Sequence, residues 1–267
     1  MKLSILNQKK EDIGKLELPS QFQEEVRPDL IKRAIIAIHY NDRQPYGADL
    51  RAGKKASAKV SRRRHSYKTS YGLGISRVPR KIMSKRGTRM NWVGAVAPGT
   101  VGGRRAHPPK ADRIWDKKVN RQERRKAIRS AIAATVMKDQ VAQNHILPQE
   151  FPFIIDASFE SLAKTKEMKT ALLNLGLGDE LARVAEKTIR SGRGKARGRR
   201  YKAKTGPLIV VSKDCSAMKA AKNIPGISVA KVTSLNVKIL ASGINPGRLT
   251  LWTQAAITEL DKKKLFI

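Results

Sequence analysis

The run LIVV, Leu208–Val211, decides the fold because it is apolar without a break. A strand of this kind is buried on both faces, as the strands of parallel sheets are. Similar short runs occur at 151–155, 229–232 and 249–252, and helix-like sequence separates them. Alternating strands and helices are typical of an α/β protein. We therefore predict a single globular α/β body with a mainly parallel sheet flanked by helices.

The predicted helices among these strands lie at 166–175, 179–189, 237–241 and 254–260. Asp156 directly follows the run at 151–155, a position where α/β enzymes often hold a catalytic acid. Capping of the next helix, by Asp156 or by Ser158, is the stronger interpretation, because Asp and Ser are preferred N-caps.

The first 42 residues also look folded, and their seven basic and seven acidic residues balance. Alternating residues at 2–7 and 15–18 predict short strands. Pro28 opens a predicted helix whose apolar residues recur at three- and four-residue spacing, so that one face can pack.

A strongly basic run, SGRGKARGRRYKAKTG (Ser191–Gly206), lies just before LIVV. Residues 187–204 contain nine basic residues and no acidic one, a net charge of +9. The planar guanidinium of arginine suits bidentate phosphate contact and base stacking. Short basic runs also serve as localisation signals, so this run alone is weak support for nucleic-acid binding.

Residues 44–109 show no sustained helical or strand periodicity. The segment holds nine glycines, five prolines and four aromatic residues among its cations, and 18 basic residues oppose one acidic residue between Arg43 and Lys110. Structureless connections of this length are usually functional or disordered. We predict an extended basic internal loop, with the globular body formed by 1–43 and 110–267.

Three aromatic side chains of this loop, Tyr67, Tyr71 and Trp92, are candidates for stacking on unpaired bases. Each such contact contributes about 1–3 kcal/mol. Packing of the loop against itself explains the same residues equally well.

Asp116 is the predicted N-cap of a helix that runs to about Val136. One stripe of this helix begins with Lys117, Arg121, Arg124 and Arg125 and then turns apolar. A helix of this kind would join a protein core to an anionic partner. The alternative interpretation is that the charged half of the helix is merely exposed to solvent. The neighbouring basic loop makes this alternative weaker.

The whole chain carries 56 Lys and Arg against 22 Asp and Glu, a net charge of +34. Residues 43–129 account for +22, with 26 basic and 4 acidic residues. Charge of this density needs a polyanion, and nucleic acid is the strongest candidate because phosphate neutralisation releases counterions. An acidic membrane is the weaker candidate, since the loop lacks the amphipathic face of a membrane helix.

Other features indicate a soluble intracellular protein. No apolar stretch is long enough to span a membrane, and Met1–Ser20 lacks the continuous apolar core of a signal peptide. The single Cys215 excludes an internal disulfide and agrees with a reducing compartment.

The sequence offers little for catalysis or metal binding. The glycines at 192, 194 and 198 have the wrong spacing and follow a helix, so they do not form a dinucleotide-binding loop. Those at 99, 102 and 103 lack the Lys-Ser/Thr ending of a P-loop. The four histidines are widely separated, which disfavours a zinc site, and Cys215 is by default an inert thiol.

Several long segments resemble one known family. These are RPDLIKRAIIAIHYNDRQPYGADLRAGKKASA (27–58), GGRRAHPPKADRIWDKKVNRQERRKAIRSAIAAT (102–135), SGRGKARGRRYKAKTGPLIVV (191–211) and NIPGISVAKVTSLNVKILASG (223–243). Together they are similar to the universal large-subunit ribosomal protein L4 family in its archaeal and eukaryotic form, over nearly the whole chain. The absence of a long basic tail after the last helix favours the archaeal type.

The resemblance implies a structural, non-enzymatic constituent of the cytoplasmic large ribosomal subunit, which binds large-subunit rRNA and supports subunit assembly. Its loop, 44–109, would be embedded in rRNA and line part of the nascent-peptide exit tunnel. The expected partners are rRNA, neighbouring ribosomal proteins and the nascent peptide, with no membrane. No catalytic residue, metal site or cofactor is implied, although structural Mg²⁺ would accompany the rRNA.

The candidate rRNA-binding residues are the cations, with one tryptophan and two histidines, of the loop, the following helix and the second basic run. They are Arg62, Arg63, Arg64, His65, Arg77, Arg80, Lys81, Lys85, Arg86, Arg89, Trp92, Arg104, Arg105, His107, Lys110, Lys117, Arg121, Arg124, Arg125, Arg193, Lys195, Arg197, Arg199, Arg200, Lys202 and Lys204. The candidate tunnel-proximal residues are Arg77, Arg80, Arg86 and Arg89.

Two hypotheses from other classes compete with this one. An RNA-modifying enzyme with a basic RNA-guiding arm would fit the α/β body and the charge, but it requires a cofactor loop or catalytic cluster. A DNA architectural protein fits the charge and predicts neither the loop length nor the α/β body.

Overall fold

The computed structural model describes residues 1–267, except for the side chain of Ser242. The chain divides into two compact units, one formed by Met1–Asn41 with Asp116–Ile267 and the other by Asp42–Trp115. We call the first unit the body and the second the insertion.

The elements have the following bounds. The strands of the body are β1 (Lys2–Leu6), β2 (Asp12–Glu17), β5 (Ile154–Ile155), β6 (Lys187–Ile189), β7 (Tyr201–Ala203), β8 (Leu208–Val211), β9 (Ser228–Lys231) and β10 (Thr250–Thr253). Its α-helices are α1 (Pro28–Asn41), α2 (Arg121–Ala134), α3 (Lys138–Ala142), α4 (Thr165–Asn174), α5 (Gly178–Ala185), α6 (Ser216–Lys222), α7 (Val237–Leu240) and α8 (Gln254–Lys262). Its short 3-10 helices are Ser20–Phe22, Ala157–Ser161, Arg193–Arg197, Val232–Ser234 and Ser242–Ile244. The insertion contains β3 (Arg80–Arg86) and β4 (Arg89–Gly94).

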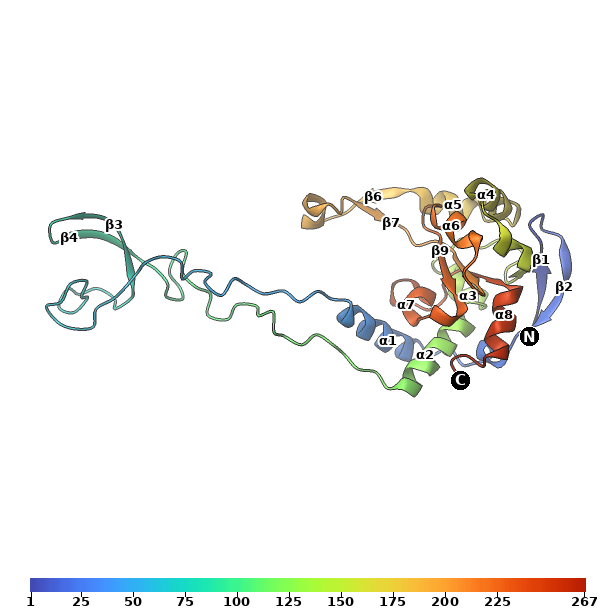
Figure 1. The fold of residues 1–267 in the computed structure, drawn as a ribbon, viewed down its shortest axis with the longest axis horizontal. Coiled ribbons are helices and arrows are strands. Elements are labelled where there is room, and N and C mark those ends of the chain that lie inside the picture. Colours follow the sequence, from blue (N-terminus) through green and yellow to red (C-terminus); the bar gives the residue numbers. More distant parts are fainter. The chain divides into compact units, whose positions relative to one another are not determined.

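A six-stranded sheet in the order β2-β1-β5-β10-β8-β9 forms the centre of the body (Figure 1). Neighbouring strands from β1 to β9 in this order run parallel, and only β2 is antiparallel to its neighbour. Helices connect the parallel strands along the chain. The predicted α/β class with a mainly parallel sheet is therefore confirmed.

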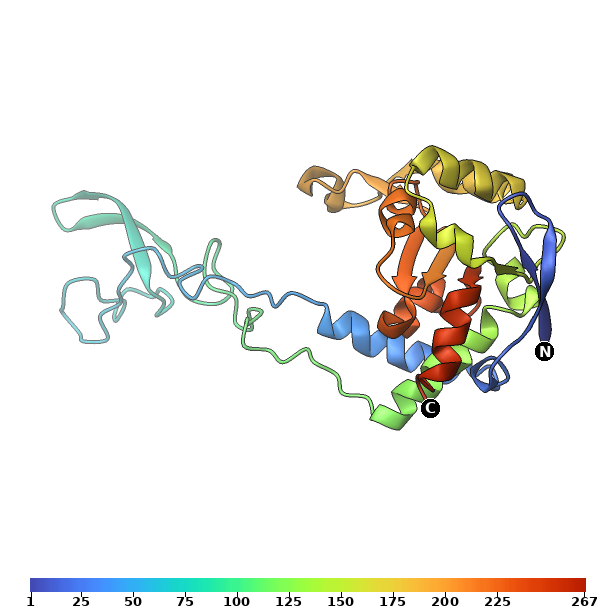
Figure 2. The same cartoon turned by 45° about the vertical axis from the view of Figure 1, so that its right-hand side comes forward.

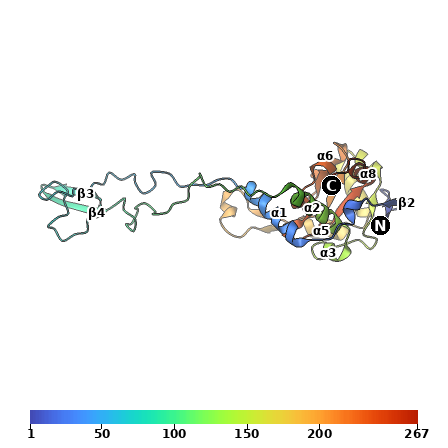
Figure 3. The same ribbon diagram turned by 90° about the horizontal axis from the view of Figure 1, so that it is seen from below.

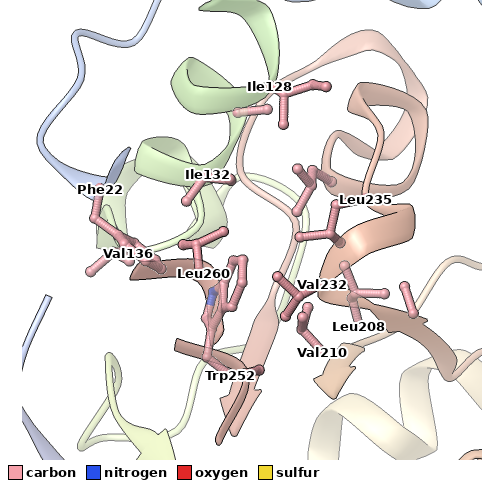
Figure 4. Packing of buried hydrophobic residues seen from close by; sticks show 14 of the residues in the cluster. Phe22, Ile128, Ile132, Val136, Leu208, Val210, Val232, Leu235, Trp252 and Leu260 are labelled. Carbon is pink, nitrogen blue, oxygen red and sulfur yellow. The ribbon is translucent and has the colours of Figure 1, made fainter. Parts of the chain in front are cut away.

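The LIVV run is buried on both faces of the sheet, as its composition predicts. Leu208 and Val210 belong to one apolar cluster, and Ile209 and Val211 belong to another on the opposite face. Successive strand residues point to opposite faces, which explains the alternation. Figure 4 shows the first cluster, in which Trp252 of β10 packs among residues of α2 and α8. Figure 2 shows α1, α2 and α8 together on this side of the sheet.

Helix α1 begins at Pro28, as predicted, and lies beside α2 (Figure 3). Helix α2 begins at Arg121, so the predicted start at Asp116 is wrong. The side-chain amide of Asn41 bonds both backbone groups of Lys117: Oδ1 accepts from the Lys117 amide at 2.8 Å, and Nδ2 donates to its carbonyl at 3.3 Å. This pairing holds Lys117 outside the helix.

The predicted helix at 179–189 ends early, because α5 stops at Ala185 and the chain continues as β6. Strand β6 pairs antiparallel with β7, and Lys187 lies opposite Ala203. A pairing with residues about fifteen positions away leaves no trace in a local helical pattern, and this explains the error.

The insertion has more regular structure than its sequence predicts. Strands β3 and β4 form an antiparallel hairpin, in which Arg86 lies opposite Arg89 across a two-residue turn. Gly87 has φ +60°, in the left-handed region that glycine adopts without strain. The prediction that 44–109 lacks regular structure is therefore wrong for this hairpin.

Arg248 joins three parts of the body and is only 4% exposed. It donates to the carbonyls of Gly206 and Ile239 at 3.0 and 2.9 Å and to Oγ of Ser228 at 2.8 Å. Burial lowers the pKa of Arg248 to about 10, so it remains charged at neutral pH.

We expect Arg248→Met to lower the free energy of unfolding by about 1–3 kcal/mol, because the buried carbonyl of Gly206 and the partly buried carbonyl of Ile239 lose their donor. Urea denaturation at pH 7 measures this change. Arg199→Met, at an exposed position, is the control and should change the stability by less than about 0.5 kcal/mol. Equal stability of the two variants would contradict the role of Arg248.

Candidate nucleic-acid interface

The hairpin formed by β6 and β7 carries the second basic run and stands away from the central sheet (Figure 1). All six residues of its two strands are exposed. The 3-10 helix Arg193–Arg197 forms its tip, and Gly198 ends that helix with φ +77°. The tip therefore presents Arg and Lys side chains to solvent from a defined turn.

Most cations of this hairpin have no acidic partner. Lys204 is paired with Glu186 at 2.6 Å, and the guanidinium of Arg190 donates to the carbonyl of Arg199 at 3.2 Å. Among the described residues, no acidic side chain lies within salt-bridge distance of the five tip cations, which are Arg193, Lys195, Arg197, Arg199 and Arg200. Their charge is therefore available to an external anion.

A buried polar cluster anchors the hairpin to the body. Arg183 of α5 donates to the carbonyl of Thr205 at 2.8 Å and forms a bidentate pair with Glu180 at 2.7 Å for each bond. Glu180 also accepts the Ile146 amide and lies 2.6 Å from Nδ1 of His145. Because His145 and Glu180 are almost fully buried, this cluster fixes the place where β7 joins the core.

Helix α2 has the predicted change of character along its length. Arg121 and Arg124 in its first half are exposed, whereas Ile128 and the residues from Ser130 to Ala134 are buried in the core. Arg125 donates to the carbonyl of Ile267 at 2.6 Å, so its side chain also forms a contact within the body. Lys117 lies before the helix, and its ammonium is 3.9 Å from the ring centre of Tyr40.

The cations of the insertion are exposed or partly exposed. The side chains from Arg62 to His65 are exposed, as are the candidate residues Arg105, His107 and Lys110. Arg104 is partly exposed. None of the candidate rRNA-binding residues is buried.

Several insertion cations lie over aromatic rings instead of acidic groups. Arg77 lies 4.3 Å from the ring centre of Tyr71, and Arg80 lies 5.4 Å from that of Trp92. Cation–π contacts of this kind orient a charged group without neutralising it. The guanidinium groups therefore keep their capacity to bind phosphate.

The two ends of the insertion meet, which the sequence does not reveal. The amide of Ala48 donates to the carbonyl of Pro109 at 3.0 Å. Two guanidinium groups lie over the Trp115 ring, with Arg43 at 3.9 Å and Arg113 at 4.3 Å from its centre. Neither arginine was a candidate, because the pairing of distant segments is needed to see this cluster.

One glycine of the insertion allows close approach of the chain to itself. A Cβ added at Gly53 would lie 2.4 Å from the backbone nitrogen of Arg104, and Gly53 has φ +72°. Any larger residue would force these two segments apart, so the glycine serves packing within the insertion.

The carboxyl edge of the parallel sheet, where α/β proteins bind substrates, is occupied by internal hydrogen bonds. Oδ2 of Asp156 accepts the Ser158 amide at 3.1 Å, which confirms the predicted cap. Hydrogen bonding from Ser158 lowers the pKa of Asp156, so its carboxyl stays ionised. Glu160 accepts from the amide and hydroxyl of Ser212 and from the Thr253 hydroxyl at 2.6 Å. Both acids therefore stabilise the fold.

Other chemistry-bearing groups are ordinary. Burial raises the pKa of the Cys215 thiol, which disfavours the reactive thiolate. Among the described residues, no three His, Cys, Asp or Glu side chains come together as a metal site. None of the described helices combines the length and the apolar character needed to cross a membrane.

A parallel α/β body with exposed arginine-rich segments defines a basic α/β protein of the kind that binds a polyanion. The sequence model of the "Ribosomal protein L4/L1 family" matches residues 16–263, and the chain belongs to this family. It is thus a structural ribosomal protein, and the hypothesis of an RNA-modifying enzyme is not supported.

Three archaeal relatives are each named "Large ribosomal subunit protein uL4". The one from Nanoarchaeum equitans is 47% identical over 268 residues, which cover 100% of both chains. The one from Archaeoglobus fulgidus is 43% identical, covering 97% of this chain and 98% of the relative. The one from Methanococcoides burtonii is 45% identical, covering 93% of each. The resemblance to the archaeal form of the family is confirmed.

Proposed function

We propose that this chain is a structural constituent of the cytoplasmic large ribosomal subunit and binds large-subunit rRNA. The observation that carries the proposal is the 47% identity, over the full length of both chains, to a protein named as a large-subunit component. The exposed cations without acidic partners at the tip of the β6–β7 hairpin supply a physical reason for RNA binding.

Three segments would share the contact with rRNA. These are the tip of the β6–β7 hairpin, the first half of α2 and the insertion. Phosphate contacts from their Lys and Arg side chains would position the protein, and the shape of the RNA would select the site. Binding would also order the insertion further, so that folding of this segment accompanies subunit assembly.

The insertion would reach the wall of the exit tunnel and contact the nascent peptide. The tip residues proposed for this contact are Arg77, Arg80, Arg86 and Arg89. All four belong to or precede the β3–β4 hairpin, and only Arg80 is partly covered. Neighbouring ribosomal proteins would complete the set of partners.

Cofractionation tests the assignment to the subunit. The protein should remain with large subunits after a wash at high salt, because an embedded insertion cannot leave without unfolding of its surroundings. Release of the protein at the first wash, with recovery in the soluble fraction, would contradict the proposal.

Deletion of residues 70–90 tests whether the three segments share the contact with rRNA. The deletion removes β3 and the turn of the hairpin, all within the insertion, so the body should fold as before. The variant should still bind rRNA through the β6–β7 hairpin and α2, with log K falling by about 0.7–0.9 per contacted phosphate for each tenfold rise in salt. Filter binding across a salt series measures both. Complete loss of rRNA affinity would contradict the shared contact.

A further inference from the structure

A pocket inside the insertion combines aromatic and cationic side chains. Its volume is about 490 Å³. Two segments form it: residues 65–73, and the hairpin of β3 and β4. The lining residues are His65, Ser66, Tyr67, Lys68, Thr69, Leu73, Lys85, Gly87, Thr88, Met90 and Trp92.

Strand geometry explains why the aromatic ring of Trp92 faces this pocket. Met90 and Trp92 are alternate residues of β4, so they share one face of the hairpin, and both are partly covered. Asn91 and Val93 lie on the opposite face and are exposed. The covered face is the one that residues 65–73 approach.

The opposite wall is a turn that presents Tyr67. The amide of Thr69 donates to the carbonyl of Ser66 at 3.1 Å, and Lys68 adopts φ +62°, in the left-handed region. Tyr67 is 58% exposed although it lines a pocket, so most of its side chain is open to a ligand. A Cβ added at Gly87, on the rim, would meet nothing within 4 Å, which leaves that side accessible.

The charges around the pocket are all positive. The ammonium groups of Lys85 and Lys68 lie 4.9 and 5.5 Å from the ring centre of Tyr67, and the guanidinium of Arg80 lies 5.4 Å from that of Trp92. None of the lining residues is acidic. The hydroxyl groups of Ser66, Thr69 and Thr88 offer donors and acceptors next to the rings. A ligand that fits this set has a flat ring with polar edges and a negative charge.

We propose that this pocket receives one unpaired nucleotide of large-subunit rRNA, with its base against Tyr67 or Trp92 and its phosphate beside Lys68 and Lys85. Proteins recognise unpaired RNA bases by stacking them on aromatic side chains, and the volume lies in the usual range for small-ligand pockets. The inference rests on the proposed function, because it names the part of the rRNA that this site binds. A nascent peptide fits the pocket less well, since its residues do not regularly combine a flat ring with a negative charge.

Ultraviolet crosslinking of the full-length chain bound to large-subunit rRNA tests the proposal directly. Mass spectrometry of the digested complex should find a nucleotide adduct on Tyr67 or Trp92. In translating ribosomes, crosslinks from these two residues to the nascent peptide in place of rRNA would overturn the proposal.

Variants separate stacking from charge. Tyr67→Leu and Trp92→Leu should each weaken rRNA binding roughly 5- to 150-fold without changing its salt dependence, because stacking of a base involves no counterion release. Lys85→Gln should instead reduce the slope of log K against log salt by about 0.7–0.9. Tyr67→Phe keeps the ring and should bind as the original chain does, which guards against a loss caused by misfolding.

Val93→Leu is the matched control, because Val93 is exposed on the opposite face of β4 and does not line the pocket. It should leave the adduct and the affinity unchanged. If the chain binds rRNA with undiminished affinity in Tyr67→Leu and Trp92→Leu, the pocket proposal fails while the proposed function stands. If the original chain shows no affinity for rRNA, the proposed function itself fails.

Discussion

Replacing the five tip cations of the β6–β7 hairpin with glutamine is expected to cause the largest loss of rRNA affinity of any local change in the body. The five residues are Arg193, Lys195, Arg197, Arg199 and Arg200, and all are exposed. If each neutralises one phosphate, the slope of log K against log salt should fall by about 4. Between 50 and 200 mM salt, the original complex should therefore weaken on the order of 100-fold more than the variant.

A control with the same loss of charge distinguishes local contact from net charge. Exchange of five other exposed lysines for glutamine, at Lys166, Lys169, Lys213, Lys219 and Lys222, lowers the net charge equally. These lysines lie on α4, on α6 and just after β8. The control should keep a slope close to that of the original chain. Equal slopes for the two variants would show that the hairpin has no special part in binding.

Glu180→Ala should destabilise the body by about 3–5 kcal/mol, the typical cost of breaking a buried ion pair by removing one partner. The variant leaves Arg183 and His145 without the carboxylate that both contact. Chemical denaturation of the full chain measures the change. Glu186→Ala is the control, because its side chain is 69% exposed and an ion pair as exposed as its pair with Lys204 contributes little to stability. A loss below about 1 kcal/mol in Glu180→Ala would contradict the anchoring role.

The carboxyl of Glu180 also makes the stability of the body sensitive to acid. Burial alone would raise its pKa, but hydrogen bonds from Arg183, His145 and the Ile146 amide outweigh burial and lower the pKa of Glu180 to about 2. Because the pKa is lower in the folded state, the ionised carboxyl stabilises that state fully when the pH is above the ordinary pKa near 4.5. The stabilisation decreases progressively as the pH falls towards 2. The contribution lost over this range is about 3 kcal/mol. Glu180→Ala should show a flatter decline of stability between pH 4.5 and 2.

The sheet could be predicted from the sequence because a strand that is buried on two faces is a continuous apolar run. The runs at Leu208–Val211 and 249–252 are apolar throughout, and both are strands within one residue of their predicted bounds. Helix α1 was likewise visible from Pro28 and its apolar spacing. The short helices α3 and α6 have weaker patterns and were not predicted.

Elements that depend on distant partners were not predicted correctly. The β3–β4 hairpin has an alternating pattern only in β4, among many cations. Strand β6 is defined by its pairing with β7, and the start of α2 by the side chain of Asn41. Each of these depends on a contact between segments far apart in the sequence, which periodicity does not record.

The sequence predicts the set of cations that forms the candidate interface, but it does not predict the contacts that individual cations make. The exposed tip of the β6–β7 hairpin agrees with the cation count of its sequence. The partners of particular cations, such as Glu186 for Lys204 and the Ile267 carbonyl for Arg125, follow only from the fold. The cluster of Arg43 and Arg113 around Trp115 had no sequence signal, because Arg43 is about seventy residues away from the other two members.

The two hydrogen bonds between Asn41 and Lys117 make the insertion modular. The chain leaves the body and returns to it at one closed point, so the core does not depend on the length of what lies between. Doubling the length of a flexible loop costs only about 0.6 kcal/mol in closure entropy. Relatives could therefore lengthen, trim or exchange this segment during evolution while they keep the same core.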